Sequence, residues 1–293
     1  MIPFLAAVDR VPQDFPTLQD AVDQGHAPTI VLGPGHWAGA VLTRPVALIG
    51  EDAVIDVGVA VPGGARAALV LPGEATGSSV RGLTMDCRGD ALDLGVYASA
   101  ARLGSAADDV TIAHDLFQGC AQAVTNAGSA QASCDETDVD GGAWWTVHDN
   151  VVSGIAGRFD AGFEGGGVGV FVFNATGAHV YANTFLGRAS APAPNAASGI
   201  ALAGCQDCAV ESNRFLVRSA RWAAITNAGA TLPGAVATRN LRLADNDAGG
   251  DSAPWLGVSF VSLDSVGTDA IGNVGTTWID HATCGDGELD AVE

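Results

Sequence analysis

The sequence has no lysine and little positive charge of any kind. Its 13 basic residues are all arginine and stand against 33 aspartates and glutamates, which gives a formal net charge of −20. A surface this negative repels nucleic acids and anionic membranes, so we exclude both as partners. We interpret the missing lysine, in a chain rich in alanine and glycine, as the coding bias of a GC-rich genome. The acidity favours divalent cations and disfavours a polyanionic substrate, unless arginine is concentrated in one place.

Long apolar runs and long amphipathic helical windows are also missing. The chain has no run of about 18 apolar residues, which excludes a transmembrane helix. Phe, Tyr and Trp make up only 6% of the residues, whereas 39 are glycine. We expect one short helix, over residues 17–24, because Leu18, Ala21 and Val22 recur at helical spacing and Gly25 follows as a stop. Strand-like segments occupy residues 29–32, 40–42, 46–49 and 54–56, with turns between them.

Six short alternating segments each end at a polar residue, which we call the corner residue. Successive corner residues are 35, 33, 30, 33 and 27 positions apart. Strand-like units at this period predict a solenoid of β-coils. The alternative is a β-sandwich with asparagine in its turns, but sandwich strands recur every 8–12 residues or so. Stacked coils place the corner residues in one amide ladder. They are Asp115, Asn150, Asn183, Asn213, Asn246 and Asn273.

The repeat also predicts which side chains point into the coil. Residues three before each corner are apolar and form one inward column, from Ile112 to Ala270. A second strand precedes some units, because apolar pairs lie 13 and 11 residues before both Asn183 and Asn213. Residues two before each corner point outward. These are Ala113, His148, Tyr181, Glu211, Ala244 and Ile271.

This outward column contains the first candidate site. His148, Tyr181 and Glu211 follow one another in line, about 5 Å apart, and His179 lies beside them. An imidazole, a phenol and a carboxylate can do acid–base work, so we predict that these four residues are catalytic. The alternative is that outward positions of a solenoid are simply polar. Arginines five after two corners are expected to stack on the next face and bind substrate, with Arg221 and Arg158 nearby. They are Arg188 and Arg218.

An acidic loop forms a second candidate site. Oxygen ligands at this density can hold Ca²⁺, although a solvated acidic loop is the alternative. The predicted ligands are Asp135, Glu136, Asp138 and Asp140. Two tryptophans follow the loop. Trp145 aligns with the buried column, so Trp144 is expected to be exposed and to stack on sugar.

Six cysteines indicate an oxidising compartment. We expect neighbouring coils to bring Cys87 and Cys120 together. Cys205 and Cys208 predict a local disulfide, with free thiols as the alternative. We therefore expect an extracellular or cell-surface protein, whose signal peptide is not present in this chain.

The N-terminal segments carry a family resemblance. Residues 14–22, 30–37 and 46–56 resemble the cap and first coil of the pectin-lyase-like superfamily. That resemblance implies an all-β, right-handed, single-stranded parallel β-helix (solenoid) with a short N-terminal capping helix. We expect it to span residues 1–283, with the cap and first coil at about 1–56. Residues 284–293 resemble the opening of Cys-rich repeats of bacterial surface proteins, so we expect a tail that begins a truncated repeat.

The activity motifs of that superfamily are largely missing. Pectin methylesterase, polygalacturonase and mannuronan epimerase segments do not occur, and lyases with a lysine base are excluded. Two hypotheses remain. The chain is a secreted protein that acts on or binds an extracellular polysaccharide, as a polysaccharide lyase or glycoside hydrolase. Alternatively, it is a non-catalytic glycan-binding or structural surface module. We expect a monomer with no cofactor other than Ca²⁺.

Overall fold

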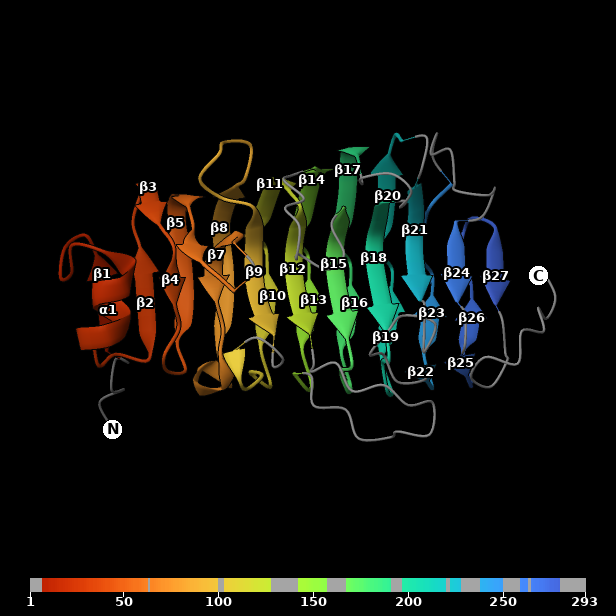
Figure 1. Ribbon diagram of the computed structural model, residues 1–293, viewed down its shortest axis with the longest axis horizontal. Helices are drawn as coiled ribbons and strands as arrows, with labels where there is room; N and C mark the ends of the chain where they lie inside the picture. Colours follow the sequence, from red (N-terminus) through yellow and green to blue (C-terminus); the bar gives the residue numbers. More distant parts are fainter. Residues whose placement is uncertain are drawn as a thin grey trace, which may run out of the picture.

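Successive coils of the chain stack along one long axis as a parallel β-helix (Figure 1). The computed structural model describes residues 7–62, 64–99, 103–127, 142–156, 167–190, 197–219, 222–227, 238–249, 259–262 and 265–279. Each coil contributes strands to as many as three faces, and nearly every pairing between neighbouring coils is parallel. The fold class predicted from the repeat is therefore confirmed.

The first face consists of short strands that end just before the corner residues. Their register matches the predicted columns, since Ile112 pairs with Val147, and Val147 with Val180. Residues with left-handed backbone flank these strands, for example Asp109 and His114 with φ of 52° and 58°. The chain therefore turns sharply on both sides of each strand. The strands are β10 (Thr111–Ala113), β13 (Thr146–His148), β16 (His179–Tyr181), β19 (Ala209–Glu211), β23 (Arg242–Ala244) and β26 (Asp269–Ile271).

The second face follows the corner, and the third face closes the coil. The predicted third-face register is confirmed, because Val170 pairs with Ile200 and Val172 with Leu202. The second-face strands are β11 (Leu116–Cys120), β14 (Val151–Ile155), β17 (Thr184–Ala189) and β20 (Arg214–Val217). The third-face strands are β4 (Ala40–Val41), β7 (Arg66–Val70), β9 (Leu94–Ser99), β12 (Gln122–Ala127), β15 (Val168–Phe173), β18 (Ala197–Ala203), β21 (Trp222–Asn227), β24 (Phe260–Ser262) and β27 (Thr277–Ile279).

The first coils differ from the later ones at the corner. The turn expected between residues 49 and 54 is wrong, because β5 (Ala47–Val57) runs through both predicted strands and β8 (Ser79–Asp86) does the same in the next coil. Gly50 lies against Gly82, where an added Cβ would meet a carbonyl oxygen at 2.4 Å. The pairing of β5 with β8 shifts register between Ile49 and Ala53, where Asp52 has a left-handed φ of 55°, so the expected turn is replaced by a bulge within one strand. The remaining elements are β1 (Val8–Val11), β2 (Thr29–Leu32), β3 (Gly35–Ala38), β6 (Val59–Ala60), η1 (Gly73–Ala75), β22 (Thr238–Arg239) and β25 (Ser265–Val266).

A helix covers the N-terminal end of the solenoid, as predicted (Figure 1). Helix α1 (Leu18–Gln24) begins after Thr17, whose side chain accepts a hydrogen bond from the Asp20 N–H. Arg44 donates to the carbonyls of Val22 and Ala27 at 2.9 and 2.8 Å and so satisfies orphan groups near the helix end. No helix in the described part of the chain is long and apolar enough to cross a bilayer.

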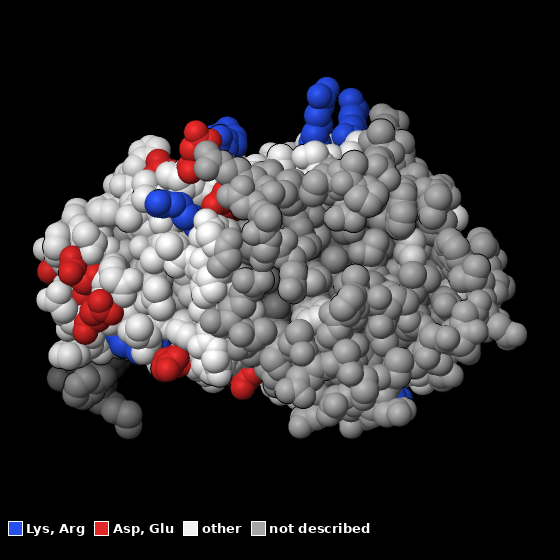
Figure 2. All heavy atoms as spheres, viewed as in Figure 1, with Lys and Arg blue, Asp and Glu red and all other residues white. Residues whose placement is uncertain are grey.

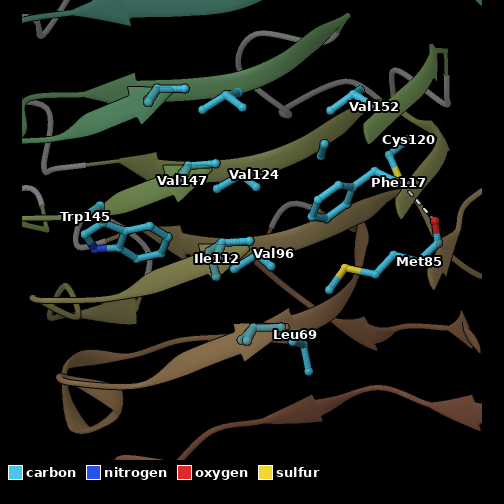
Figure 3. Close-up of a cluster of buried hydrophobic side chains, with 14 of the residues drawn as sticks. Leu69, Met85, Val96, Ile112, Phe117, Cys120, Val124, Trp145, Val147 and Val152 are labelled. Atoms are coloured by element: carbon cyan, nitrogen blue, oxygen red, sulfur yellow. Dashed lines mark hydrogen bonds between the residues drawn. The ribbon is translucent and has the colours of Figure 1, made fainter. Parts of the chain in front are cut away.

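The interior is a continuous apolar column that every coil shares. Figure 3 shows Ile112 and Val147 of the first face next to Val96 and Val124 of the third. The second face adds Phe117 and Val152, and farther along Phe185 stacks on Phe215 with ring centroids 4.8 Å apart. A single coil cannot bury such a surface alone, so each coil is stabilised by its neighbours.

The corner residues form the predicted ladder. Asn150, Asn183, Asn213 and Asn246 each donate from Nδ2 to Oδ1 of the next corner residue at 3.0 Å. Each ladder Oδ1 also accepts the backbone N–H of the preceding corner residue, as Asn183 Oδ1 does from Asn150 at 3.1 Å. These amides are buried and fully paired, so the ladder fixes the stacking of the coils.

Both predicted disulfides are present. Cys87 and Cys120 join adjacent coils across 33 residues, with Cα atoms 4.8 Å apart. Cys205 and Cys208 close a local loop. The free-thiol alternative is therefore wrong for Cys205 and Cys208. Residues 284–293, the expected tail, lie outside the described part of the chain.

Candidate active site on the first face

The outward side chains of four neighbouring strands form one polar surface. We call it the polar face and define it by the outward residues of β13, β16, β19 and β23. Strand pairing puts His148 beside Tyr181 and Tyr181 beside Glu211, as the repeat predicted. Its members are Thr146, His148, His179, Tyr181, Ala209, Glu211, Arg242 and Ala244.

Glu211 joins two cationic or donor side chains at the centre of the polar face. Its Oε2 lies 2.9 Å from His179 Nε2, and its Oε1 lies 2.8 Å from Arg242 Nε. The carboxylate side chain is 25% exposed, compared with 40% for His179 and 58% for Arg242. Glu211 therefore orients the imidazole through Nε2, which leaves His179 Nδ1 as the ring nitrogen available to a ligand.

The Tyr181 ring lies against two imidazoles. His148 stacks on it with centroids 4.8 Å apart and planes 2° from parallel. His179 lies 4.4 Å away from the same ring at a tilt of 38°. The three rings come from two adjacent coils, so the stacking of the coils sets their spacing. The structure thus brings all four predicted catalytic residues together.

Trp144 borders the polar face at the turn before β13. The residue is 60% exposed, whereas Trp145 is buried and donates from Nε1 to the Ala107 carbonyl at 2.7 Å. The Trp144 ring lies over Gly177 of the next coil, where an added Cβ would come within 2.3 Å of the ring. Because Gly177 has no side chain, the indole of Trp144 can pack directly against its backbone. The predicted exposure of Trp144 is confirmed.

Arg242 is the charged member of the polar face that the sequence pattern did not predict. It stands four residues before Asn246, as His179 stands four before Asn183. Strand pairing aligns both with Ala209 between them. Extending that one column to the next coil was a sufficient signal to find it.

The predicted arginines lie on the second face, as expected. Arg188, near the end of β17, and Arg218, just after β20, are exposed and stack in register, because Gly187 pairs with Val217. A sharp corner separates them from the polar face, so they do not belong to the Glu211 cluster. Arg221 and Arg158 lie outside the described residues. The acidic loop with Asp135, Glu136, Asp138 and Asp140 does too.

Two outward residues are more buried than the repeat suggested. Ala113 and Ala244 are 5% and 1% exposed. Each one-carbon side chain lies between longer neighbours in its column, Ala113 between Arg81 and His148 and Ala244 between Glu211 and Ile271. These residues still belong to the outward column, but the longer side chains of the neighbouring coils shield the two alanines from solvent.

Among the described residues, one group has the composition and spacing to hold a metal ion. It consists of His114, His148 and Asp149, whose ligand atoms lie within 4.8 Å of one another. The group adjoins the polar face through His148.

Figure 2 shows acidic side chains of the described residues toward the N-terminal end, with basic side chains among them, and further basic side chains that project from the edge to which β17 runs. Arg188, Arg214 and Arg218 are all exposed on these second-face strands or just after them. An otherwise acidic protein therefore has a local concentration of arginine.

No protein-family model matches the chain, and a search of curated proteins found no match either. A solved structure with a detectable likeness is the tailspike protein gp49 from Acinetobacter baumannii bacteriophage Fri1, a capsular polysaccharide depolymerase. The two are 12% identical with a TM-score of 0.35, and the match covers 93% of this chain and 62% of that one. This chain thus spans less than two thirds of the length of the tailspike chain. A likeness of that degree carries no argument about function.

Proposed function

We propose that the polar face binds an extracellular polysaccharide and cleaves it by β-elimination beside a uronic acid, which makes the protein a polysaccharide lyase. The observation that supports this most strongly is the Glu211 carboxylate, which joins His179 to Arg242 next to the Tyr181 ring. Base, acid and cation thus lie within one small area. Outward positions repeat about every 4.8 Å along the coils, a spacing that suits successive sugar rings of a polymer.

The elimination assigns one task to each side chain. His179 Nδ1 takes the proton from the carbon next to the uronic carboxylate, and Arg242 stabilises the negative charge that develops there. The bond to the leaving glycosidic oxygen then breaks while a C=C bond forms in the sugar. Tyr181 donates its hydroxyl proton to that oxygen. Water returns the proton from His179 to Tyr181, so the enzyme is restored.

His148 and Glu211 act as positioning residues in this scheme. Glu211 fixes the tautomer of His179 by accepting from Nε2. The parallel stack of His148 holds the Tyr181 ring in one orientation. Trp144, Arg188 and Arg218 serve as proposed binding residues for the rest of the chain of sugars.

Hydrolysis is supported less well than elimination. A glycoside hydrolase needs two carboxyl groups flanking the scissile bond. Glu211 is the one carboxylate that the described strands β13, β16, β19 and β23 point outward, and both its oxygens are engaged. A lyase needs no second carboxylate.

The test is a panel of uronic and neutral polysaccharides, read by unsaturated-product absorbance and by new reducing ends. Elimination raises both signals on a uronic polymer. His179→Ala and Tyr181→Phe should each lower the rate at least 10²-fold, roughly the share of one proton-transfer group. Arg242→Ala should do so as well, whereas Arg88→Ala, which breaks a similarly exposed ion pair with Asp86, should not.

Two results would contradict the lyase. Reducing ends without absorbance indicate a hydrolase. Tight binding of a polysaccharide without any product indicates the non-catalytic surface module, which is the second function that the sequence allows.

A further inference from the structure

We infer that His114, His148 and Asp149 form a binding site for a transition-metal ion, with Zn²⁺ as the best match. The site lies at the edge of the polar face, across two adjacent coils. It shares His148 with the polar face, but the inference does not depend on the proposed lyase activity, because it is tested by metal binding and not by turnover.

The three side chains are already gathered. His148 Nδ1 lies 2.7 Å from Asp149 Oδ2, and the His114 ring meets the His148 ring edge-on with centroids 5.7 Å apart. One ligand atom from each residue falls within 4.8 Å of the other two. Tetrahedral Zn²⁺ needs ligand atoms about 3.4 Å apart, as follows from bond lengths near 2.1 Å. Shifts of about 1 Å in exposed side chains close that difference.

The backbone fixes where these side chains start. His114 and Asp149 each lie one residue before a corner residue in consecutive coils, and both have left-handed backbone, with φ of 58° and 54°. The His114 N–H points toward the His148 carbonyl at 3.4 Å. Ala182, Ser212 and Asp245 take this conformation in later coils, so the fold itself imposes the turn. The chemistry comes from the residue types in these two coils.

The donor set selects the class of metal. Two imidazoles and one carboxylate suit Zn²⁺ and neighbouring divalent transition metals, whereas Ca²⁺ requires six to eight oxygen ligands or so. Three protein ligands leave a fourth position open to water or to a ligand on the polar face. His114 and Asp149 are exposed, so an ion can enter from solvent.

Among the described residues, His36 and Asp56 provide a natural control. They form the same kind of pair, with 2.5 Å between Nδ1 and Oδ2, and are not part of a three-ligand group. The described coils therefore contain two such histidine–aspartate pairs, and one of them, His148 with Asp149, has a third potential ligand in His114. If Zn²⁺ binding requires all three ligands, substitution of His114 or Asp149 should weaken it and substitution of His36 should not.

The experiment titrates ZnCl₂ into the EDTA-treated, dialysed full chain by isothermal titration calorimetry. We expect one site that His114→Ala and Asp149→Asn each weaken at least tenfold and that His36→Ala leaves unchanged. Because both site residues are exposed, circular dichroism should show intact folding of the variants. Wild-type affinity in both site variants, an equal loss in His36→Ala, or no Zn²⁺ binding would each overturn the proposal.

A second measurement needs no variant. X-ray absorption at the zinc edge of the wild-type complex should show two imidazoles with oxygen as the remaining neighbours. Sulfur in the first shell would place the ion on cysteine elsewhere in the chain and overturn the assignment.

Discussion

The backbone N–H of Asp115 donates to Oδ1 of Asn150 at 2.9 Å, so a carboxyl group stands at the head of a ladder of asparagine amides. Asp115 Oδ1 accepts the N–H of Leu83 at 2.7 Å, as each later corner oxygen accepts from the coil before it. Its Oδ2 therefore takes the place of an amide Nδ2. In Asn150 that nitrogen donates to two acceptors, whereas Asp115 Oδ2 is buried without a partner.

A protonated Asp115 can donate where an ionised one cannot. Burial raises the pKa of Asp115 to about 7 from an ordinary value near 3.8. The folded chain thus holds a proton that the unfolded chain releases above pH 4 or so. Stability is fully present below that pH and falls as the pH rises toward 7, by up to about 4 kcal/mol for three pKa units or so.

The first prediction follows from this linkage. Asp115→Asn restores an amide donor at the head of the ladder, so it should raise the free energy of unfolding at pH 8 and flatten its dependence between pH 4 and 7. Urea unfolding at several pH values measures both. Asp109→Asn, at an exposed left-handed corner, is the matched control and should change little. A pH profile of Asp115→Asn identical to that of the wild type would show that the carboxyl is not the source.

Removal of a central ladder amide should be costly. Asn183 donates to the carbonyls of Val147 and Tyr181 and accepts from Asn150, so Asn183→Ala leaves buried groups unpaired. We expect a loss of about 2–4 kcal/mol in urea unfolding. Asn273, at the far end of the ladder and only half-buried, should cost clearly less when changed to alanine. Equal losses at the two positions would contradict a cooperative ladder.

The two disulfides should differ in their effect on stability. The Cys87–Cys120 bond spans 33 residues, so its removal by a double serine substitution should cost roughly 3–4 kcal/mol through the entropy of the unfolded chain. The Cys205–Cys208 bond spans 3 residues and should cost about 2 kcal/mol or less. Thermal unfolding of both double variants compares them. A larger loss for the short loop would show that the unfolded-chain entropy is not the dominant effect.

Trp144 should report on ligand binding directly. Its side chain is 60% exposed, so Trp144→Ala should change stability by less than about 1 kcal/mol. If the indole stacks on a sugar ring, the variant should bind a uronic oligosaccharide about tenfold more weakly. Most ligand-induced quenching of tryptophan fluorescence should also disappear, since among the other tryptophan side chains that the structure describes Trp145 and Trp222 are buried and Trp37 lies on β3, near the N-terminal end. Quenching that persists in Trp144→Ala would place the ligand elsewhere.

The repeat was sufficient to predict much of this structure from sequence. Because side chains alternate along a strand, the spacing from Asn150 to Asn183 and Asn213 determined both the ladder and the row of His148, Tyr181 and Glu211. The spacing of the repeat does not determine the angle at which the chain turns at each corner. Counting five residues past the corner predicted that Arg188 and Arg218 stack on the next face, but not how far the corner angle sets them apart from Glu211.

The repeat also did not predict which side chains of the polar face contact one another. The same column that contains His179 contains Arg242, but only coordinates show that both reach one carboxylate. The raised pKa of Asp115 depends on burial and on which oxygen faces an acceptor, and neither follows from spacing. The group of His114, His148 and Asp149 was not predicted, because His114 and Asp149 occupy turn positions and the repeat pattern described only strand positions.

The mass of the products from a purified uronic polysaccharide tests the central claim most directly. Elimination on the polar face predicts fragments whose new non-reducing end lacks one water relative to a hydrolysis product, formed by the wild type and abolished in His179→Ala. Fragments that carry the full mass of hydrolysis products would contradict the account, as would unsaturated fragments that His179→Ala still forms at the wild-type rate.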